Sequence, residues 1–327
     1  MKHLDVTYTN GVIAAREKKL LGDRVLRLCE LDAEEAFRAL LETGFGGGAE
    51  TTANVYEYEK LIAKEEQSLD EFIREYAPSD AEQAYFLAPR DFHNAKALIK
   101  AAFLGVDAQS MLSPDGFLSA DWLKERVATG DFSAIKEKNE WLGSACEDAT
   151  ALLSEEPNGA KVGEIFEKAL YVYLYAVAKK NKTLKALLTA KTDMTNILTA
   201  FRAGEEWQAE EKYLPTGNSD ITKKLRLLFQ EDEDKIKRVF SATVYADFVS
   251  ACLQAKRQGK PMTEAERMRD GYEEKFFAKR KYELVKNEPF LYYVYRRQME
   301  CVNVRIVFVC LLAGLREQEI KNRLRAK

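Results

Sequence analysis

The feature that most constrains this chain is a pattern that occurs three times along it. A Glu-Lys pair opens a predicted helix, and an acid followed three residues later by Asn comes 26 to 32 residues after that Glu. Because an ordered set of marks at a regular interval is typical of repeated supersecondary units, we predict three copies of one unit. The pairs are Glu59-Lys60, Glu167-Lys168 and Glu274-Lys275, and the acid and Asn positions are Asp91/Asn94, Asp193/Asn196 and Glu300/Asn303.

Two weaker marks support this repeat. A Pro-x-Gly turn follows the first two copies as Pro114/Gly116 and Pro215/Gly217, and the third copy reaches the last residue where its turn would fall. Leu-rich openings recur at Leu26, Leu123 and Leu225. A chain of 327 residues can hold two or three domains. We therefore predict three helical repeat units, at 1–113, 114–214 and 215–327.

Helical periodicity predicts an all-α fold. Apolar residues three and four apart form one stripe along 55–76. A second helix is predicted to open at Asp32, with acids in its first turn, and to end before Gly44. The stretch 166–180 alternates Tyr residues as a strand would, but its Glu-rich start and Lys-rich end follow the helix dipole and favour a buried helix. Seven prolines in the whole chain agree with this class.

An apolar run at 306–315 looks like the start of a membrane span. A spanning helix needs about 20 mostly apolar residues. One Arg costs roughly 2.5–3.5 kcal/mol, whereas each Leu, Ile, Phe or Val gains only roughly 0.3–0.6 kcal/mol. Because Glu300 and Arg305 precede the run, we predict a buried helix instead. There is no signal-peptide pattern and the five cysteines lack CxxC spacing, so we expect a soluble cytoplasmic chain with reduced thiols.

The acid and Asn of each copy share one helix face, which leaves three possible roles for them. Asp91 and Asp193 could be N-caps, but Glu300 is a poor cap and lies inside a predicted continuous helix after Pro289. A buried acid–amide pair that fixes helix register accounts better for all three copies. Catalysis by these acids together with His93 is the sharper alternative.

Motifs for catalysis and cofactor binding are missing from the sequence. It has no HExxH, no paired-Cys spacing, no GxxxxGK[ST] loop and no GxGxxG after a strand, so we predict no catalytic, metal or cofactor-binding residue and no cofactor. The Gly-rich stretch 44–48 favours a flexible loop between helices, with a small chance of anion binding. The run 275–282 interleaves aromatic and cationic residues, but at helical spacing its aromatics are expected in the core. A pI near 5.8 argues against a dedicated nucleic-acid protein.

The net charge of −3 hides an asymmetry. From Lys256 to the end, 18 Lys and Arg oppose 10 Asp and Glu, a balance of +8 that leaves −11 on the rest of the chain. The basic end could bind an acidic partner, nucleic acid or anionic lipid, although a solvated helix face is the favoured interpretation. The candidate interface residues are Arg305, Arg316, Lys321, Arg323 and Arg325.

Several stretches carry a family resemblance that spans nearly the whole chain. In the C-terminal segment 288–324 these are Pro289-Phe290-Leu291, Glu300 with Asn303 and Arg305, and Gly314-Leu315-Arg316. Earlier in the chain they are YTNGVIAAREKKLL, LLETGFGG and PRDFHNAKALIKA. These stretches resemble the C subunit of A-type/V-type rotary ATPases, the family that includes the d subunit of eukaryotic V-type ATPases. The C-terminal motif is fairly specific, whereas the middle of the chain is more divergent.

The resemblance implies an all-helical funnel of three similar bundles in a pseudo-threefold arrangement. It also implies a non-catalytic central-stalk subunit, present once per complex and monomeric in isolation, on the cytoplasmic face of the membrane. Such a subunit is a socket that couples the central-shaft subunits to the membrane rotor ring, for ATP-driven ion transport or ATP synthesis. The implied partners are the shaft and the ring, without nucleic acid. A soluble helical-repeat adaptor unrelated to ATPases is the alternative, and the sequence does not distinguish a proton from a sodium machine.

Overall fold

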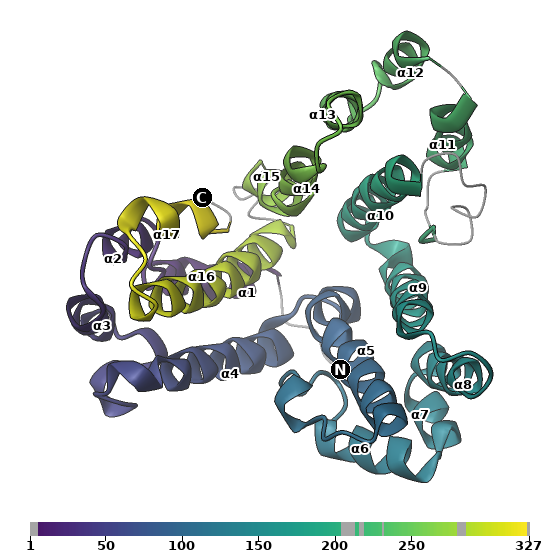
Figure 1. The fold of residues 1–327 in the computed structure, drawn as a ribbon. Helices are drawn as coiled ribbons and strands as arrows, with labels where there is room; N and C mark the ends of the chain where they lie inside the picture. The colour runs from purple at the N-terminus through teal and green to yellow at the C-terminus, as the bar shows by residue number, and fades with distance from the viewer. Residues whose placement is uncertain (1–5, 204–212, 216–218, 231, 280–285, 326–327) are drawn as a thin grey trace. The chain divides into compact units, whose positions relative to one another are not determined.

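The structure is a computed structural model, and it describes residues 6–203, 213–215, 219–230, 232–279 and 286–325. Over these ranges the regular secondary structure consists of α-helices and short 3-10 helices (Figure 1), which confirms the predicted all-α class. None of the described helices is long and apolar enough to cross a membrane, including the one that carries the apolar run 306–315.

The chain folds into two compact units. Unit 1 combines residues 1–79 with residues 271–327, whereas unit 2 consists of residues 80–270. Both ends of the chain therefore belong to one unit, and the other unit is inserted between them. The three repeat units predicted from the sequence are a different division of the chain, and they remain a prediction.

Unit 1 is built on two long antiparallel helices, α4 (Tyr58–Tyr76) and α16 (Glu288–Leu312). Tyr58 stacks on Phe308 with ring centroids 5.3 Å apart, and Phe72 stacks on Phe290 at 5.7 Å, so the two helices run in opposite directions. The other elements of this unit are α1 (Val6–Glu17), α2 (Arg24–Leu28), α3 (Ala33–Glu42), η1 (Phe45–Glu50), η2 (Val55–Glu57), α15 (Tyr272–Ala278) and α17 (Glu317–Arg323).

Helix α16 is the central helix of unit 1. Phe308 is fully buried and meets Phe37 of α3 edge-on at 5.9 Å, while Ile320 of α17 lies in the same core. Burying one such side chain contributes roughly 1.5–3 kcal/mol. The core of unit 1 therefore depends on contacts between residues from the two ends of the sequence.

Unit 2 contains two groups of contacting helices. In the first, Phe92 of α5 stacks on Tyr173 of α9 at 6.1 Å, above a core that reaches from α5 to α9. In the second, α10 contacts α11, α13 and α14. The first group comprises α5 (Asp80–Leu104), η3 (Gln109–Met111), α6 (Ala120–Thr129), α7 (Phe132–Lys138), α8 (Glu140–Glu155) and α9 (Gly159–Val177). The second comprises η4 (Ala178–Lys180), α10 (Lys182–Ala203), α11 (Ser219–Gln230), α12 (Glu233–Phe240), α13 (Ala246–Arg257) and α14 (Thr263–Asp270).

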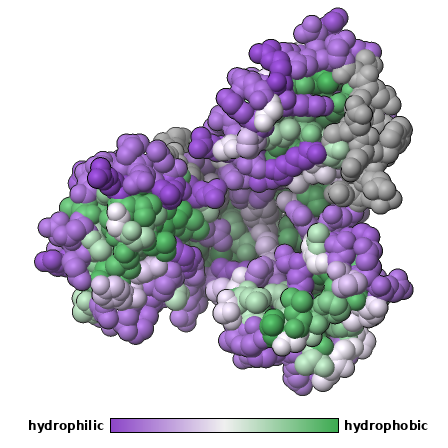
Figure 2. All heavy atoms as spheres, in the orientation of Figure 1, coloured by the Kyte–Doolittle hydropathy of each residue, from purple (hydrophilic) through white to green (hydrophobic). Residues whose placement is uncertain are grey.

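The helices predicted from periodicity are present. Asp32 caps α3, because its carboxylate accepts a hydrogen bond from Glu35 N–H at 2.8 Å, and Gly44 follows the helix with a φ of 74°. The predicted stripe 55–76 forms α4, preceded by one 3-10 turn. The stretch 166–180 belongs to α9 and η4, so the Tyr alternation does not mark a strand. Figure 2 shows hydrophilic residues over most of the visible surface, with apolar areas between them.

Two local predictions are wrong. Asp91 and Asp193 are not N-caps, because α5 begins at Asp80 and continues through Pro89, and α10 begins at Lys182. The Gly-rich stretch 44–48 is not a loose loop. A side chain at Gly46 would collide with the Leu61 backbone carbonyl, so the glycines let this turn pack directly on α4.

Candidate functional site

The three acid and Asn pairs lie at matching places, inside the long helices α5, α10 and α16 (Figure 1). All six side chains are buried, with exposed fractions from 0% to 8%. Burying so many polar groups is costly unless each one is hydrogen-bonded, so their partners define what the pairs do.

Each Asn binds both backbone groups of one residue further along the chain. Asn94 Nδ2 donates to Ser113 O at 3.1 Å, and its Oδ1 accepts from Ser113 N–H at 2.8 Å. Asn196 makes the same two bonds to Leu214 at 2.9 and 2.8 Å. Asn303 makes them to Arg325, both at 2.8 Å. We call this pair of bonds the amide clamp.

The amide clamp ties the segment after each long helix back onto that helix. The clamped residue lies 18 to 22 positions after the Asn. In the first two copies it immediately precedes the Pro of the Pro-x-Gly turn, where the backbone is already restricted to extended conformations. The predicted acid–amide lock is thus corrected, because the amides bind returning backbone. Gly217 of the second turn lies outside the described residues.

The three acids at the matching position have different partners. Asp91 accepts backbone N–H groups from Phe117 and Leu118 at 3.0 and 3.1 Å. Asp193 accepts a hydrogen bond at 2.7 Å from the hydroxyl of Tyr245, which lies between α12 and α13. Glu300 accepts a hydrogen bond from Gly22 N–H at 3.0 Å and another from the Arg297 guanidinium at 2.9 Å. The acids therefore fix neighbouring segments, as the amides do.

The turn around Asp91 leaves no room for a side chain at Gly116. A Cβ at this position would collide with Asp91 Oδ1 and would lie 2.6 Å from Leu87 O. The Gly of the Pro-x-Gly turn is thus required because it lets the backbone reach the buried carboxylate. Asp91 and Gly116, which the sequence pattern marks separately, therefore meet in one contact.

Around Glu300 the structure forms a buried ionic network. Arg297 Nε lies 3.0 Å from Glu65 of α4, and Glu65 also accepts Gly46 N–H at 2.9 Å. Burial raises the pKa of Glu300, although Gly22 N–H and Arg297 oppose the shift. Burial also disfavours the charge on Arg297, but Glu65 and Glu300 outweigh it and hold the pKa of the guanidinium above its ordinary value. The anion that the Gly-rich turn binds is therefore Glu65 of the chain itself.

The repeated geometry continues to the ends of two of these helices. Gly105 and Gly314, each eleven residues after the clamping Asn, end α5 and α16 with φ values of 67° and 75°. Two residues earlier, Phe103 and Leu312 expose 48% and 38% of their surface. The corresponding part of the second copy lies outside the described residues.

Several of the candidate interface cations have partners within unit 1. Arg305 donates to both carboxylate oxygens of Glu59, at 3.0 and 3.1 Å, and its side chain remains 39% exposed. Lys321 donates to Glu30 at 2.8 Å and to Glu317 at 2.6 Å. Arg323 donates to Glu319 O at 2.9 Å, and Arg316, Arg323 and Arg325 are exposed.

The remaining chemical predictions concern His93, the thiols and the aromatic run. His93 Nε2 lies 2.9 Å from Met111 O and is exposed, so it also contacts the segment that follows α5. Within the described ranges no three acid, His or Cys side chains are grouped to hold a metal ion. All five cysteines are buried, and burial raises the pKa of Cys146 and of Cys252 to about 12. Phe276 and Phe277 are buried, whereas residues 280–282 of that run lie outside the described residues.

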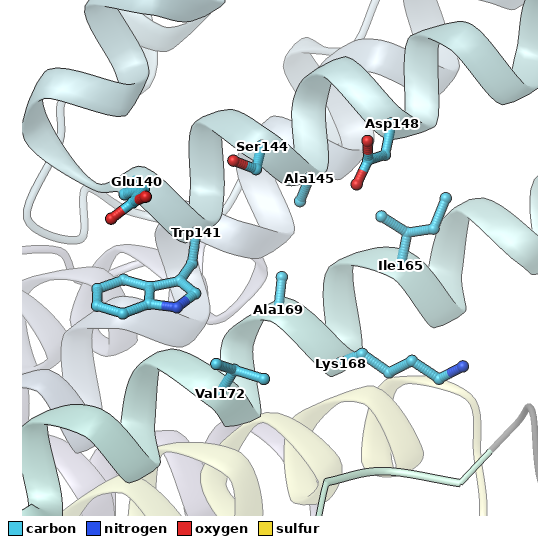
Figure 3. Close-up of a pocket in the computed structure, with 9 residues that line it drawn as sticks. All are labelled: Glu140, Trp141, Ser144, Ala145, Asp148, Ile165, Lys168, Ala169 and Val172. Atoms are coloured by element: carbon cyan, nitrogen blue, oxygen red, sulfur yellow. The ribbon is translucent and has the colours of Figure 1, made fainter.

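Sequence reasoning missed some partners of these acids. Arg297 precedes Glu300 by three residues on the same helix face, a spacing that pointed to an ion pair. Tyr245 and Gly22 carry no such signal, because each meets its acid across a long sequence separation. A groove between α8 and α9 was also missed (Figure 3).

In its described parts this protein is an all-helical scaffold whose buried polar side chains hold connecting segments in place. Comparison with known proteins identifies the family to which this scaffold belongs. The model of the ATP synthase (C/AC39) subunit family matches residues 9–323, and the chain belongs to this family. The chain is similar to the C subunit of the V-type sodium ATPase of Enterococcus hirae, with 20% identity over 97% of each sequence.

Proposed function

We propose that this protein is the non-catalytic central-stalk subunit of a V/A-type rotary ATPase. It is a socket that couples the central rotor shaft to the membrane rotor ring, for ATP-driven ion transport or ATP synthesis. The observation that carries the proposal is the family match over residues 9–323, which leaves little of the chain for another role. Membership of this family also removes the alternative of an adaptor unrelated to ATPases.

A socket that transmits torque needs a stiff body. The amide clamps on α5, α10 and α16 support this role, because each one ties a connecting segment to a long helix through two hydrogen bonds of a buried Asn side chain. The buried network around Arg297 does the same for the 19–22 segment. In the proposed molecule the three repeat units form three similar bundles about a pseudo-threefold axis, with a funnel-shaped opening for the shaft.

The proposed partners are the shaft subunits on one side and the ring on the other. One copy occupies each complex on the cytoplasmic face of the membrane, and the isolated chain is a monomer. At the end of α5, Phe103, Leu104 and Val106 expose 48%, 68% and 49% of their surface, and such a group of neighbouring apolar side chains supports a role in assembly. The exposed cations Arg316, Arg323 and Arg325 form a proposed contact with an acidic partner.

Two measurements test this function. The first isolates the native complex from gently solubilised membranes and identifies the chains that co-elute with this protein by mass. ATPase head, shaft and ring subunits should co-elute, whereas recovery of this chain alone would contradict the proposal. The second compares membranes with and without this chain. Without it, ATP hydrolysis by the head should persist while ATP-driven ion transport is lost, and re-adding the chain should restore transport.

The direction and the transported ion are left to the other subunits. The sodium in the name of the Enterococcus hirae relative describes that protein's complex. In the proposed role this chain meets the shaft and the cytoplasmic face of the ring, and the ion is selected by the ring within the membrane.

A further inference from the structure

Unit 2 carries a groove between α8 and α9 with a volume of about 390 Å³ (Figure 3). The two helices are joined by the short segment 156–158, and the side chains of both point into the gap between them. The groove is lined by Glu140, Trp141, Ser144, Ala145, Asp148, Ile165, Lys168, Ala169 and Val172.

The floor of the groove is apolar and made largely of small residues. Ala145 and Ala169 allow another backbone to come close, and Val172 leaves 40% of its surface exposed. Trp141 is fixed at one end, because its ring lies 5.5 Å from that of Tyr173. An apolar stripe with small side chains at its centre is the surface on which a further helix packs.

The rim on the α8 side is acidic and has no cation of its own. Glu140 and Asp148 are exposed, and within the described ranges neither carboxylate has a Lys or Arg nitrogen within 4 Å. Glu147 of the same helix, which is outside the groove, is paired with Lys136. Among the described residues, the two acids that border the apolar floor on the α8 side are therefore not neutralised by a cation, whereas Lys168 of α9 lines the opposite side of the groove.

We propose that this groove binds an amphipathic helix of a partner subunit, with its apolar stripe on the floor and two cationic side chains at Glu140 and Asp148. The inference rests on the proposed function, in which the partner belongs to the same rotary ATPase. Eight residues separate the two acids, a rise of about 12 Å along a helix. The partner helix therefore carries Lys or Arg at two positions seven or eight residues apart. Apolar residues lie between them at i, i+3 or i+4, and i+7.

The acidic rim also decides between a protein helix and a lipid surface. Biological membranes expose anionic headgroups, which Glu140 and Asp148 would repel, whereas a cationic helix gains charge complementarity. Binding of anionic vesicles through this groove is therefore an outcome that would overturn the proposal.

The first experiment adds purified full-length chain to the ATPase complex prepared without it and measures affinity by fluorescence titration. The double variant Glu140→Lys/Asp148→Lys should bind at least about tenfold more weakly than wild type, and the difference should shrink at high salt. Asp121→Lys/Glu155→Lys makes the same charge change at exposed sites outside the groove, and it should bind like wild type. Ala169→Trp fills the groove without changing charge and should also weaken binding about tenfold.

The second experiment measures protection of a new thiol at the groove. Because all five native cysteines are buried, Val172→Cys introduces an accessible thiol that reacts with a maleimide in the isolated chain. In the assembled complex this thiol should be protected, whereas Val244→Cys, at a site 80% exposed outside the groove, should keep its reactivity. This test does not depend on whether Ala169→Trp folds.

The outcomes separate the two proposals. If wild type joins the complex and both groove variants bind equally well, the groove is not a docking site but the proposed function stands. Continued labelling of Val172→Cys in the complex leads to the same conclusion. If wild type does not join the complex at all, both proposals fail. Capture of the Val172→Cys variant by phosphatidylglycerol vesicles, blocked once its new thiol is labelled, would replace the helix with a lipid surface.

Discussion

Helices α5 and α16 each carry an acid and an Asn three residues apart, but the buried acid is neutralised differently in the two helices. Around Asp91 the partners are two backbone N–H groups, and the turn that supplies them needs Gly116. Around Glu300 the partners are one backbone N–H and the side chain of Arg297, which Glu65 also holds. The first arrangement depends on backbone shape, whereas the second depends on balanced charge, so different substitutions should break them.

The largest effect is expected from Arg297→Met. This change leaves the buried Glu300 and the partly buried Glu65 without their shared cation, which should lower the free energy of unfolding by roughly 3–5 kcal/mol. Denaturant unfolding monitored by circular dichroism measures it. Arg296→Met is the matched control, because Arg296 is only half-buried and lies over the Tyr292 ring at 5.6 Å. Equal losses in the two variants would mean that the α16 arrangement does not depend on charge.

At α5 the corresponding change is Gly116→Ala. The new methyl group would displace the turn and weaken both bonds to Asp91, with an expected loss of about 3 kcal/mol. Gly163→Ala in α9 meets nothing within 4 Å and should instead stabilise the protein by roughly 0.5–1 kcal/mol. Thermal melting of both variants checks the opposite signs. A Gly116→Ala protein as stable as wild type would show that close backbone approach is not what places the Asp91 turn.

The amide clamps are shared by both helices, so removing them tests what the two have in common. Asn94→Ala and Asn196→Ala should each cost about 2 kcal/mol, because the backbone N–H and C=O of the half-buried Ser113 and of the buried Leu214 lose their partners. Asn303→Ala should cost less, since its partner Arg325 lies on an exposed segment where water can replace the amide. Chemical unfolding of the three variants gives the order, and a larger loss at Asn303 would contradict this account.

The pH dependence of stability distinguishes the charged arrangement at Glu300 from the backbone arrangement at Asp91. The pKa of Glu300 is raised in the folded state, so the native protein holds this proton more tightly than the unfolded chain does. Stability from this group is therefore complete below the ordinary carboxyl pKa of 4.5 and decreases as pH rises through the raised value. Glu300→Gln removes this dependence. The stability difference between Glu300→Gln and wild type should shift in favour of the variant as pH increases, and a constant difference would refute the prediction.

The smallest effect on stability is expected at the exposed end of α16. Arg305→Met breaks an ion pair with Glu59 that is screened by water, which should cost less than about 1 kcal/mol. If Arg305 belongs to an interface, the same variant should nevertheless bind the rest of the complex more weakly at low salt. Glu59→Gln breaks the same internal pair but leaves the cation, so unchanged binding by both variants would leave Arg305 with a purely internal role.

Much of the fold could be predicted from the sequence because the local helix signals agree with the packing that the tertiary structure requires. The Asp32 cap, the stripe at 55–76 and the dipole-ordered charges at 166–180 each indicate a helix by themselves. The start of α5 could not be placed in the same way. Pro89 is a common helix-start signal, but packing of the buried residues before it extends the helix back to Asp80.

The site was partly predictable for a related reason. A repeat shows which positions recur, and the three acid and Asn pairs that it marks are buried, but it does not show what they bind. Asn94 and Asn303 bind backbone atoms, which every residue has, so the residue types of Ser113 and Arg325 do not indicate the contact. Likewise, nothing in the letters around Tyr245 indicates that its hydroxyl meets Asp193.

The inserted position of unit 2 has a consequence for how the chain is made. Synthesis on the ribosome runs from the N-terminus, so α1 to α4 emerge first, and α16 emerges only after residues 80–270 have been added. Until then Phe37 and Phe72 lack the partner helix against which they pack. The nascent first segment must therefore wait with apolar side chains uncovered, and it is the part of the molecule for which a chaperone matters most during translation.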